Sequence, residues 1–559
     1  EPEFFNPKNR YTAQQSNFSK IPGSPVAYWA SKALFSVFEQ GSLLCNFAQP
    51  KQGMSTCDVN HFTRFWAEVS VTRTNINDAH NLLHWVRYNK GGNYRKWYGN
   101  KEYIVYWGGD GNALITNNAL LRNRDVYFKP FIAWTKISSS GTGFRKFEEY
   151  YLFDGAGGSL FMSTSIIGEL YLLGLLNSKV CTLVLNLISP TLNFNENHIG
   201  SIPVIETDDD KMRKSVEENV VRSVQISRDD WGSYETSWDF KRHPLLRTVL
   251  YLADAYTAWK SECEERFQQL KTNEEELNRI FIDIYGLQDE MTPEVADKDV
   301  TVHRIFDTKD DVPESMQGSN YVRTKRDEIV SLLSYAVGCM FGRYSLDEEG
   351  LILAGQPLNR HFYEGQSPRS GTGVAGAPGM NVPNGQFYYK VDGDLKKCTF
   401  NLDRDGILPI TDEEYLEDDI ISRLCDWLKA AYGADTLEEN LDFIAGALGG
   451  KGNSSREIIR SYFLKDFFKD HCKTYQKRPI YWLFDSGKQN GFKALIYLHR
   501  YTPDTIGNLR VDYLHKMQRV YESEINRMQD MIDHSTNARE VAASTKRKEK
   551  LQKQLKECR

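Results

Sequence analysis

The chain has 559 residues and a formal net charge of −6. It is too long for one hydrophobic core, and its length predicts about three or four domains of ~150 residues each. The composition is that of an ordinary soluble globular protein, and no apolar run reaches the ~18 residues that a membrane helix needs. Its nine cysteines form no Cys-x-x-Cys pair. This pattern indicates reduced thiols and argues against a zinc site, so we expect a cytoplasmic protein without membrane contact or bound metal.

The net charge conceals an asymmetry between the front of the chain and the remainder. Residues 1–205 hold 19 Lys and Arg against 14 Asp and Glu, a net of +5. The remainder holds 50 against 61, a net of −11. A basic front on an acidic body favours a polyanion as the partner of the front. A chance imbalance on solvated faces explains the same numbers equally well.

Residues 1–205 are predicted to form a strand-rich mixed α/β domain. Glycine-bearing turns separate short runs of aromatic and β-branched residues, which is typical of strands. The expected elements are a helix over 31–41, strands over 66–72, 101–107 and 126–136, a second helix over 166–176, and a compact turn with a short strand over 191–205.

The stretch 51–69, KQGMSTCDVNHFTRFWAEV, combines a glycine turn with a short polar tip between apolar anchors. A polar loop mounted on a packed domain is a common place for recognition residues. Side chains at the tip can hydrogen-bond base edges, and flanking cations can reach phosphates. The alternative is an ordinary Asx-type turn before a strand. The candidate base readers are Thr56, Asp58 and Asn60, and the candidate phosphate contacts are Lys51 and Arg64.

Two further segments of the front domain carry candidate DNA contacts. Basic and aromatic residues alternate over 85–98, which suits phosphate contact and base stacking; the alternative is a hairpin with inward-facing rings. The loop 137–145 is rich in serine and glycine and ends in an arginine, the commonest specific partner of guanine. A flexible connector is equally compatible with that loop. The candidates are Lys90, Arg95 and Lys96 for phosphates, and Ser139, Ser140 and Arg145 for bases.

Several motifs imitate enzymatic sites and fail on context. The stretch YYLFDGAGGSLF over 150–161 imitates the first S-adenosylmethionine motif of methyltransferases. However, the Asn/Asp-Pro-Pro-aromatic tetrapeptide of adenine chemistry occurs nowhere in the chain. The G-x-G-x-x-G pattern over 371–376 has neither a preceding strand nor a following helix pattern, and the glycines over 446–452 miss two P-loop positions. We therefore assign no catalytic, cofactor-binding or metal-binding residue.

The rest of the chain is predicted to be a mostly helical body. Amphipathic helices are expected over 208–227, 244–271, 274–285 and 456–475, and a β-hairpin over 477–501. Apolar residues at three/four spacing over 511–532, followed by a basic tail, predict a helical hairpin or coiled coil. The fold class is therefore α+β. The predicted regions are 1–205 (strand-rich domain), 206–355 (acidic helical spacer), 356–400 (Gly/Pro-rich insert), 401–510 (helical domain with hairpin) and 511–559 (helical hairpin or coiled coil).

Several stretches together resemble the C-terminal half of PglX, the adenine-specific DNA methyltransferase family of BREX phage-defence systems. That family is related to the fused methylase–specificity enzymes of type II restriction–modification. The resemblance runs in order along nearly the whole chain, except for the insert around 370. Members of this family often have glycine at the position that Cys57 occupies here. The matching stretches are GMSTCDVNHFTRFWAEV (53–69), NKGGNYRKWYGNKEYIVYW (89–107), YFKPFIAWTKISSSGTGFR (127–145), LNFNENHIGSIPV (192–204), NEEELNRIFIDIYGL (273–287) and KRPIYWLFDSGKQNGFKALIYLHRY (477–501).

The resemblance implies that residues 1–205 are a target-recognition domain that binds double-stranded DNA and presents an adenine for N6-methylation. The methyltransferase domain, with its S-adenosylmethionine, would lie in a longer protein of which this chain is a part. The alternative is a protein-interaction module. In that case the acidic body and the C-terminal hairpin would dock other BREX proteins or a DNA-mimicking phage inhibitor.

Overall fold

The computed structural model groups the chain into two compact units. Short sheets and helices fill unit 1, whereas unit 2 is mostly helical and ends in a helical hairpin. The predicted α+β class is thereby confirmed. Unit 1 consists of Glu1–Trp66, Arg73–Gly232 and Lys260–Arg323, and unit 2 of Ala67–Thr72, Ser233–Trp259 and Thr324–Arg559. The residues that the structure describes are 14–76, 78–80, 84–137, 141–164, 167–364, 386–391 and 394–559.

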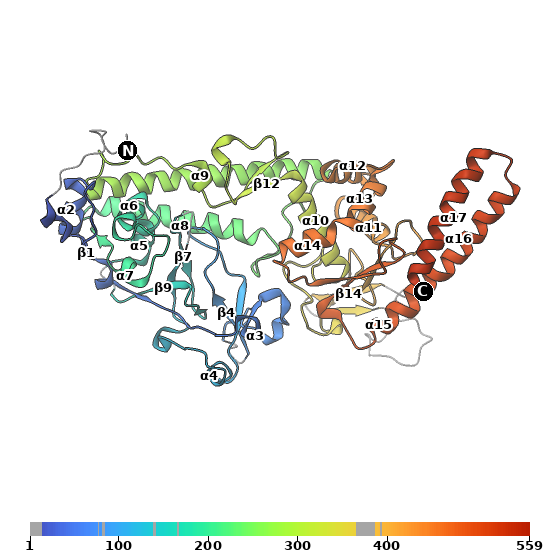
Figure 1. The fold of residues 1–559 in the computed structure, drawn as a ribbon, viewed down its shortest axis with the longest axis horizontal. Coiled ribbons are helices and arrows are strands. Elements are labelled where there is room, and N and C mark those ends of the chain that lie inside the picture. The colour runs from blue at the N-terminus through green and yellow to red at the C-terminus, as the bar shows by residue number, and fades with distance from the viewer. Residues whose placement is uncertain are drawn as a thin grey trace, which may run out of the picture. The chain divides into compact units, whose positions relative to one another are not determined.

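Two four-stranded sheets form the strand-rich part of unit 1 (Figure 1). Their strand orders, β2-β9-β6-β7 and β3-β5-β4-β8, bring together segments that are far apart in the sequence. All pairs are antiparallel except β4 with β8, which run parallel. The strands are β2 (Ala48–Lys51), β3 (Thr63–Phe65), β4 (Trp85–Asn89), β5 (Tyr103–Tyr106), β6 (Phe131–Thr135), β7 (Phe144–Phe147), β8 (Leu152–Phe153) and β9 (Gly157–Met162).

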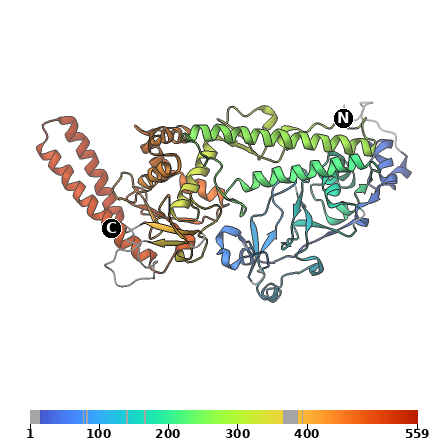
Figure 2. The ribbon, with the colours of Figure 1, turned by 180° about the vertical axis from the view of Figure 1, so that it is seen from behind.

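Helices supply the rest of the unit 1 core. Helix α5 is buried over six successive residues, and α8 runs beside the unit 1 part of α9 in both views (Figures 1 and 2). The predicted helix over 31–41 is confirmed as α2, whose N-cap Ser31 accepts a hydrogen bond from the Leu34 amide. The remaining elements are α1 (Gln15–Phe18), α2 (Lys32–Gln40), β1 (Ser42–Leu43), α3 (Val59–Phe62), α4 (Asn112–Thr116), α5 (Glu169–Leu176), α6 (Lys179–Ile188), α7 (Glu196–Gly200), β10 (Pro203–Val204), α8 (Asp210–Gly232), α9 (Leu252–Tyr285), β11 (Arg304–Phe306) and β12 (Val322–Thr324).

Within the described part of the chain, no single helix is long and apolar enough to cross a membrane. Helices α5 and α6 meet that criterion only as a pair, with a bend of 70° between them. Most residues of both helices are buried in the core of unit 1.

Four predicted elements are wrong in their extent or type. The helices expected over 244–271 and 274–285 are one continuous helix, α9, which begins at Leu252. Asn273 and Glu274 are buried within it, and Glu274 accepts a hydrogen bond from the Trp97 indole instead of marking a helix start. The strand expected over 66–72 is replaced by two short 3₁₀ turns. There the chain belongs to unit 2, where the Ala67 carbonyl contacts the His499 ring at 2.7 Å. The helix expected over 456–475 is divided into α13 and α14 at Asp466.

Unit 2 packs helices around α10 and a three-stranded antiparallel sheet of order β16-β18-β17. The β-hairpin predicted over 477–501 is confirmed, with Tyr481 opposite Tyr497. The C-terminal hairpin of α16 and α17 is confirmed as well. The elements are α10 (Lys325–Met340), β13 (Phe362–Glu364), β14 (Phe387–Val391), β15 (Asp394–Lys397), β16 (Ile407–Ile410), α11 (Ile420–Tyr432), α12 (Leu437–Leu448), α13 (Ser455–Lys465), α14 (Phe467–Thr474), β17 (Tyr481–Asp485), β18 (Lys493–Tyr497), α15 (Thr505–Asn508), a π-helix (Leu509–Leu514), α16 (His515–His534) and α17 (Ala538–Cys558).

Candidate nucleic-acid interface

Residues 52–61, which we call the polar tip, run from the end of β2 into the first three residues of α3 and are held by main-chain hydrogen bonds. The Met54 amide donates to the Phe153 carbonyl at 2.9 Å, and the Gly155 amide donates to the Met54 carbonyl at 2.8 Å. Ser55 exchanges a pair of such bonds with Leu120, at 2.9 and 2.8 Å. The tip is therefore fastened on two sides by bonds that do not depend on its side chains.

Gly53 makes this fastening possible because it allows a close approach of two backbones. A Cβ atom at this position would lie 2.1 Å from the carbonyl oxygen of Phe153. Such a contact is far inside van der Waals range, so any side chain here would push the tip off its mount. The glycine turn seen in the sequence is thus a requirement of packing.

Cys57 sits at the bend of the tip with a left-handed backbone, φ 58°. Its thiol donates to the carbonyl of Asn118 at 3.3 Å. Glycine adopts this conformation without steric cost, whereas other residues rarely do. The left-handed backbone is a physical reason why glycine would suit this position.

The predicted base readers of the tip differ in exposure. Thr56 is buried, 2% exposed, so its side chain cannot contact a base in this conformation. Asp58 is exposed and caps α3, because its Oδ1 accepts from the His61 amide at 2.9 Å. The side chains of Asn60 and His61 are exposed, and neither makes a hydrogen bond within the described residues. Asp58, Asn60 and His61 thus present one carboxylate, one amide and one imidazole to solvent.

Arg64 and Lys51 flank the tip. The Arg64 guanidinium donates to the carbonyls of Asn60, His61 and Thr63 at the end of α3. It also lies 5.6 Å from the centre of the Trp85 ring. Arg64 therefore holds α3 in place. Lys51 is half-buried at the end of β2.

Two of the three predicted phosphate contacts over 85–98 are engaged inside unit 1. Arg95 is 5% exposed and lies 3.4 Å from the Asp230 carboxylate, and Lys96 donates to Glu274 at 2.8 Å. Burial alone would raise the pKa of Asp230, but His303 and Arg95 outweigh it and lower that pKa to about 2. Arg95 and Lys96 thus pin this segment to α8 and α9. Lys90 is half-buried, 5.0 Å from the centre of the Tyr103 ring.

Arg145, the predicted reader of guanine, is fully buried on β7. Its guanidinium donates to the Arg95 carbonyl at 3.0 Å and to the Thr135 hydroxyl at 3.1 Å. Burial lowers the pKa of Arg145 to about 10. The assignment of Arg145 to base reading is therefore corrected to a structural role. Ser139 and Ser140 lie outside the described residues.

The fold brings beside the tip polar residues that were not among the predicted readers. Asn117 and Asn118 are exposed after α4, next to Leu120, which pairs with Ser55 of the tip. The only sequence signal was a pair of asparagines after a short helix. His61 was not among the predicted readers, although it directly follows Asn60 in the sequence. Among the described residues, no group of three or more His, Cys, Asp or Glu is arranged to hold a metal.

Asp154, in the stretch that imitates a cofactor motif, serves the mount of the tip. Its carboxylate accepts from the Tyr88 hydroxyl at 2.6 Å and from the Ala156 amide at 2.7 Å. Burial and the neighbouring Asp154 raise the pKa of Tyr88 well above its ordinary value. The aspartate thus shapes the turn that receives the backbone of Met54.

Comparison with known proteins supports the resemblance seen in the sequence. No protein-family model matches the chain. The adenine-specific methyltransferase PglX of Lacticaseibacillus casei (strain Zhang) is 36% identical over 552 residues, covering 95% of the chain and 41% of the relative. The adenine-specific methyltransferase BrxX of Escherichia coli O9:H4 (strain HS) is 34% identical over 554 residues, covering 98% and 43%. The chain is therefore homologous to adenine-specific methyltransferases and spans about two fifths of their length.

Proposed function

We propose that unit 1 reads the DNA sequence for a site-specific adenine-N6 methyltransferase of a BREX phage-defence system, with the polar tip as its reading element. One observation carries the proposal. Asn60 and His61 are exposed polar side chains that make no hydrogen bond within the described residues, on a backbone fastened to two neighbouring segments. Exposed side chains that are not committed to an internal hydrogen bond, on a fixed mount, are available to a ligand. The homology to adenine-specific methyltransferases supports DNA as that ligand.

The chemistry of the tip suits base edges in the major groove. An asparagine amide can donate to and accept from adenine at once, and a carboxylate can accept from the cytosine amino group. In this proposal Asn60, His61 and Asp58 read bases, and Lys51 contacts a phosphate. Thr56, Arg95, Lys96 and Arg145 support the domain from inside. Arg64 does not contact DNA in this proposal; it holds α3, which carries Asn60 and His61, in position.

In a longer protein, a methyltransferase domain with bound S-adenosylmethionine would act on an adenine extruded from the duplex. The chain studied here would select the site. A DNA-mimicking inhibitor would compete with DNA for unit 1, and other BREX proteins would bind elsewhere on the chain.

The test uses the full 559-residue chain and a pool of duplexes with a randomised central segment. Retained duplexes are sequenced for wild type, for Asn60→Ala/His61→Ala, and for the matched surface control Asn453→Ala in unit 2. We expect wild type and the control to enrich the same motif, and the tip variant to lose preference for at least one base pair. If wild type enriches no motif, or the tip variant keeps the wild-type motif, the proposal is wrong.

A further inference from the structure

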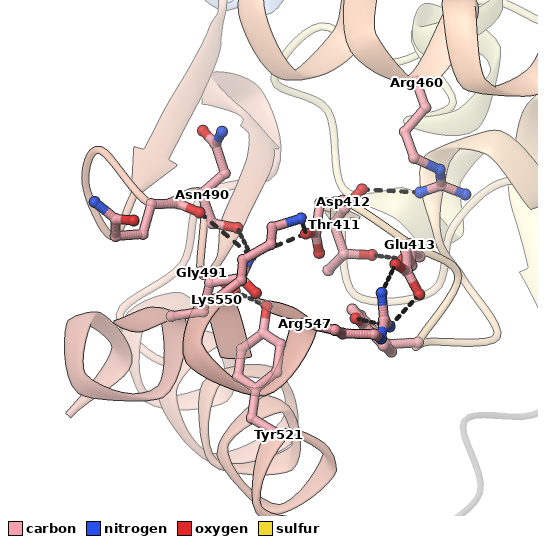
Figure 3. A network of polar contacts seen from close by, with 12 residues as sticks. Thr411, Asp412, Glu413, Arg460, Asn490, Gly491, Tyr521, Arg547 and Lys550 are labelled. Atoms are coloured by element: carbon pink, nitrogen blue, oxygen red, sulfur yellow. Dashed lines mark hydrogen bonds and ion pairs between the residues drawn. The ribbon is translucent and has the colours of Figure 1, made fainter. Parts of the chain in front are cut away.

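The helical hairpin of α16 and α17 is anchored to unit 2 by one side of α17 (Figure 3). The Arg547 guanidinium pairs with Glu413, and Lys550 pairs with Asp412 at 2.5 Å. The Gln554 amide donates to Asp412 at 2.9 Å. On α16, the Tyr521 hydroxyl donates to the Gly491 carbonyl at 2.6 Å.

An apolar seam lies beneath these polar contacts. Its residues recur at a helical spacing of three, four or seven, so they lie on one face of the hairpin, and that face is buried against the rest of unit 2. The other side of α17 is left to solvent. The buried side chains of the seam are Met517, Tyr521, Met528, Leu551 and Leu555.

The solvent side of α17 carries a row of cations. Arg539, Lys546 and Lys553 recur every seven residues, about 10.5 Å apart along the axis, and Lys556 follows one turn later. All four are exposed, and none forms an ion pair with another described residue. Two acids of α17 are exposed: Glu549 lies among the four cations, and Glu540 of the first turn accepts a hydrogen bond from Ser535. Over 538–559 the chain holds eight Lys and Arg against three Glu. We call these four cations the basic row.

We propose that the basic row binds the phosphate backbone of duplex DNA independently of sequence. It would thereby add a second DNA contact to the one proposed for unit 1. The inference rests on the proposed function for the identity of the polyanion. The charge and spacing of the row come from α17 itself.

The surroundings of the row favour a polyanion over a protein partner. The cores of protein interfaces are rich in aromatic residues and poor in lysine. None of the large exposed hydrophobic residues of the described chain lies on α16 or α17. Long, mobile lysines on a helix suit phosphate oxygens, which they contact without fixed geometry.

The test compares three variants of the full chain by equilibrium binding to a mixed-sequence 30-base-pair duplex across a salt series. The variant Lys546→Ala/Lys553→Ala/Lys556→Ala removes three charges, and alanine keeps the helix propensity. The control Lys451→Ala/Lys473→Ala/Lys477→Ala removes three exposed charges elsewhere in unit 2. The variant Lys546→Arg/Lys553→Arg/Lys556→Arg keeps the charge. Circular dichroism checks that all variants remain folded.

We expect the first variant to bind roughly tenfold or more weakly, with a salt slope shallower by about two to three. The charge-preserving variant and the control should bind like wild type. An unchanged slope in the first variant, or an equal loss in the control, would overturn the inference. The outcome is separable from that of the tip, because Asn60→Ala/His61→Ala alters the enriched motif and not the salt slope.

Discussion

The polar tip and the segment 94–97 both contain polar residues that the sequence predicts to be exposed. In the fold, however, the contacts that hold each segment come from different atoms, main chain at the tip and side chains in 94–97. At the tip the main chain makes the holding contacts, and side chains such as Asn60 and His61 project into solvent. In the segment 94–97 the side chains hold: Lys96 and the Trp97 indole both donate to Glu274, at 2.8 and 2.7 Å. The polar and charged residues of this domain therefore divide into those that remain exposed to solvent and those that assemble the domain. Burial, which the sequence does not reveal, separates them.

The largest effect should come from breaking the holding contacts. Arg95→Ala removes the guanidinium that lies 3.4 Å from the buried Asp230 carboxylate, and we expect a loss of about 3 kcal/mol in unfolding free energy. Urea unfolding measures it. The control is Arg124→Ala, which removes an exposed pair with Asp110 and should cost less than about 1 kcal/mol. Equal losses in the two variants would contradict the assignment of Arg95.

The same contact predicts a dependence of stability on pH. The pKa of Asp230 is about 2 in the fold, below its ordinary value of 3.8, so its contribution is present above pH 4 and is lost as pH falls toward 2. The shift corresponds to about 2 kcal/mol. The stability difference between wild type and Asp230→Asn should therefore shrink between pH 5 and pH 2.5. A difference that stays constant over this range would show that Asp230 is not held as an anion.

On the other side of the comparison, Asn60→Ala should leave stability within about 0.5 kcal/mol, because the side chain is exposed. We expect a loss of about 1–3 kcal/mol in discrimination at one base pair. Lys51→Ala should instead weaken binding to all sequences alike. Competition binding with single-base substitutions measures both. If both variants lost the same affinity for every sequence, Asn60 would not read a base and Lys51 would not differ from it in role.

The smallest effect concerns the bend of the tip. Cys57→Gly should change stability by less than about 0.5 kcal/mol, since relief of the left-handed backbone offsets the extra freedom of the unfolded chain. Cys57→Val should destabilise more, because β-branched residues fit this conformation poorly. Thermal unfolding compares the two. A stabilising valine would show that the backbone bend is not the constraint.

The sequence predicted elements whose cause is local. Alternating apolar runs on either side of a glycine turn define β17 and β18, and Ser31 marks the start of α2. The extent of α9 was not predictable from the sequence. Asn273 and Glu274 resemble the start of a helix, but in the structure both are buried in the middle of α9. The strand order of the two sheets in unit 1 depends on long-range pairs such as β4 with β8, which no local pattern encodes.

The candidate site was predictable only in part. The glycine turn and polar cluster located the tip, because both are local features. Arg145 and Lys96 carried the same signal as a true DNA contact, a cation in a basic domain. Their partners, Thr135 and Arg95 for Arg145 and Glu274 for Lys96, become visible only after folding.

The fastening of the tip by main-chain hydrogen bonds has a consequence for how specificity can change over time. Every residue type except proline supplies the same amide and carbonyl, so Met54 and Ser55 would hold the tip whatever residues stand at 60 and 61. Substitutions there are free of the cost of folding. If the tip reads DNA as proposed, its reading side chains can therefore be exchanged one at a time, without rebuilding the domain that carries them.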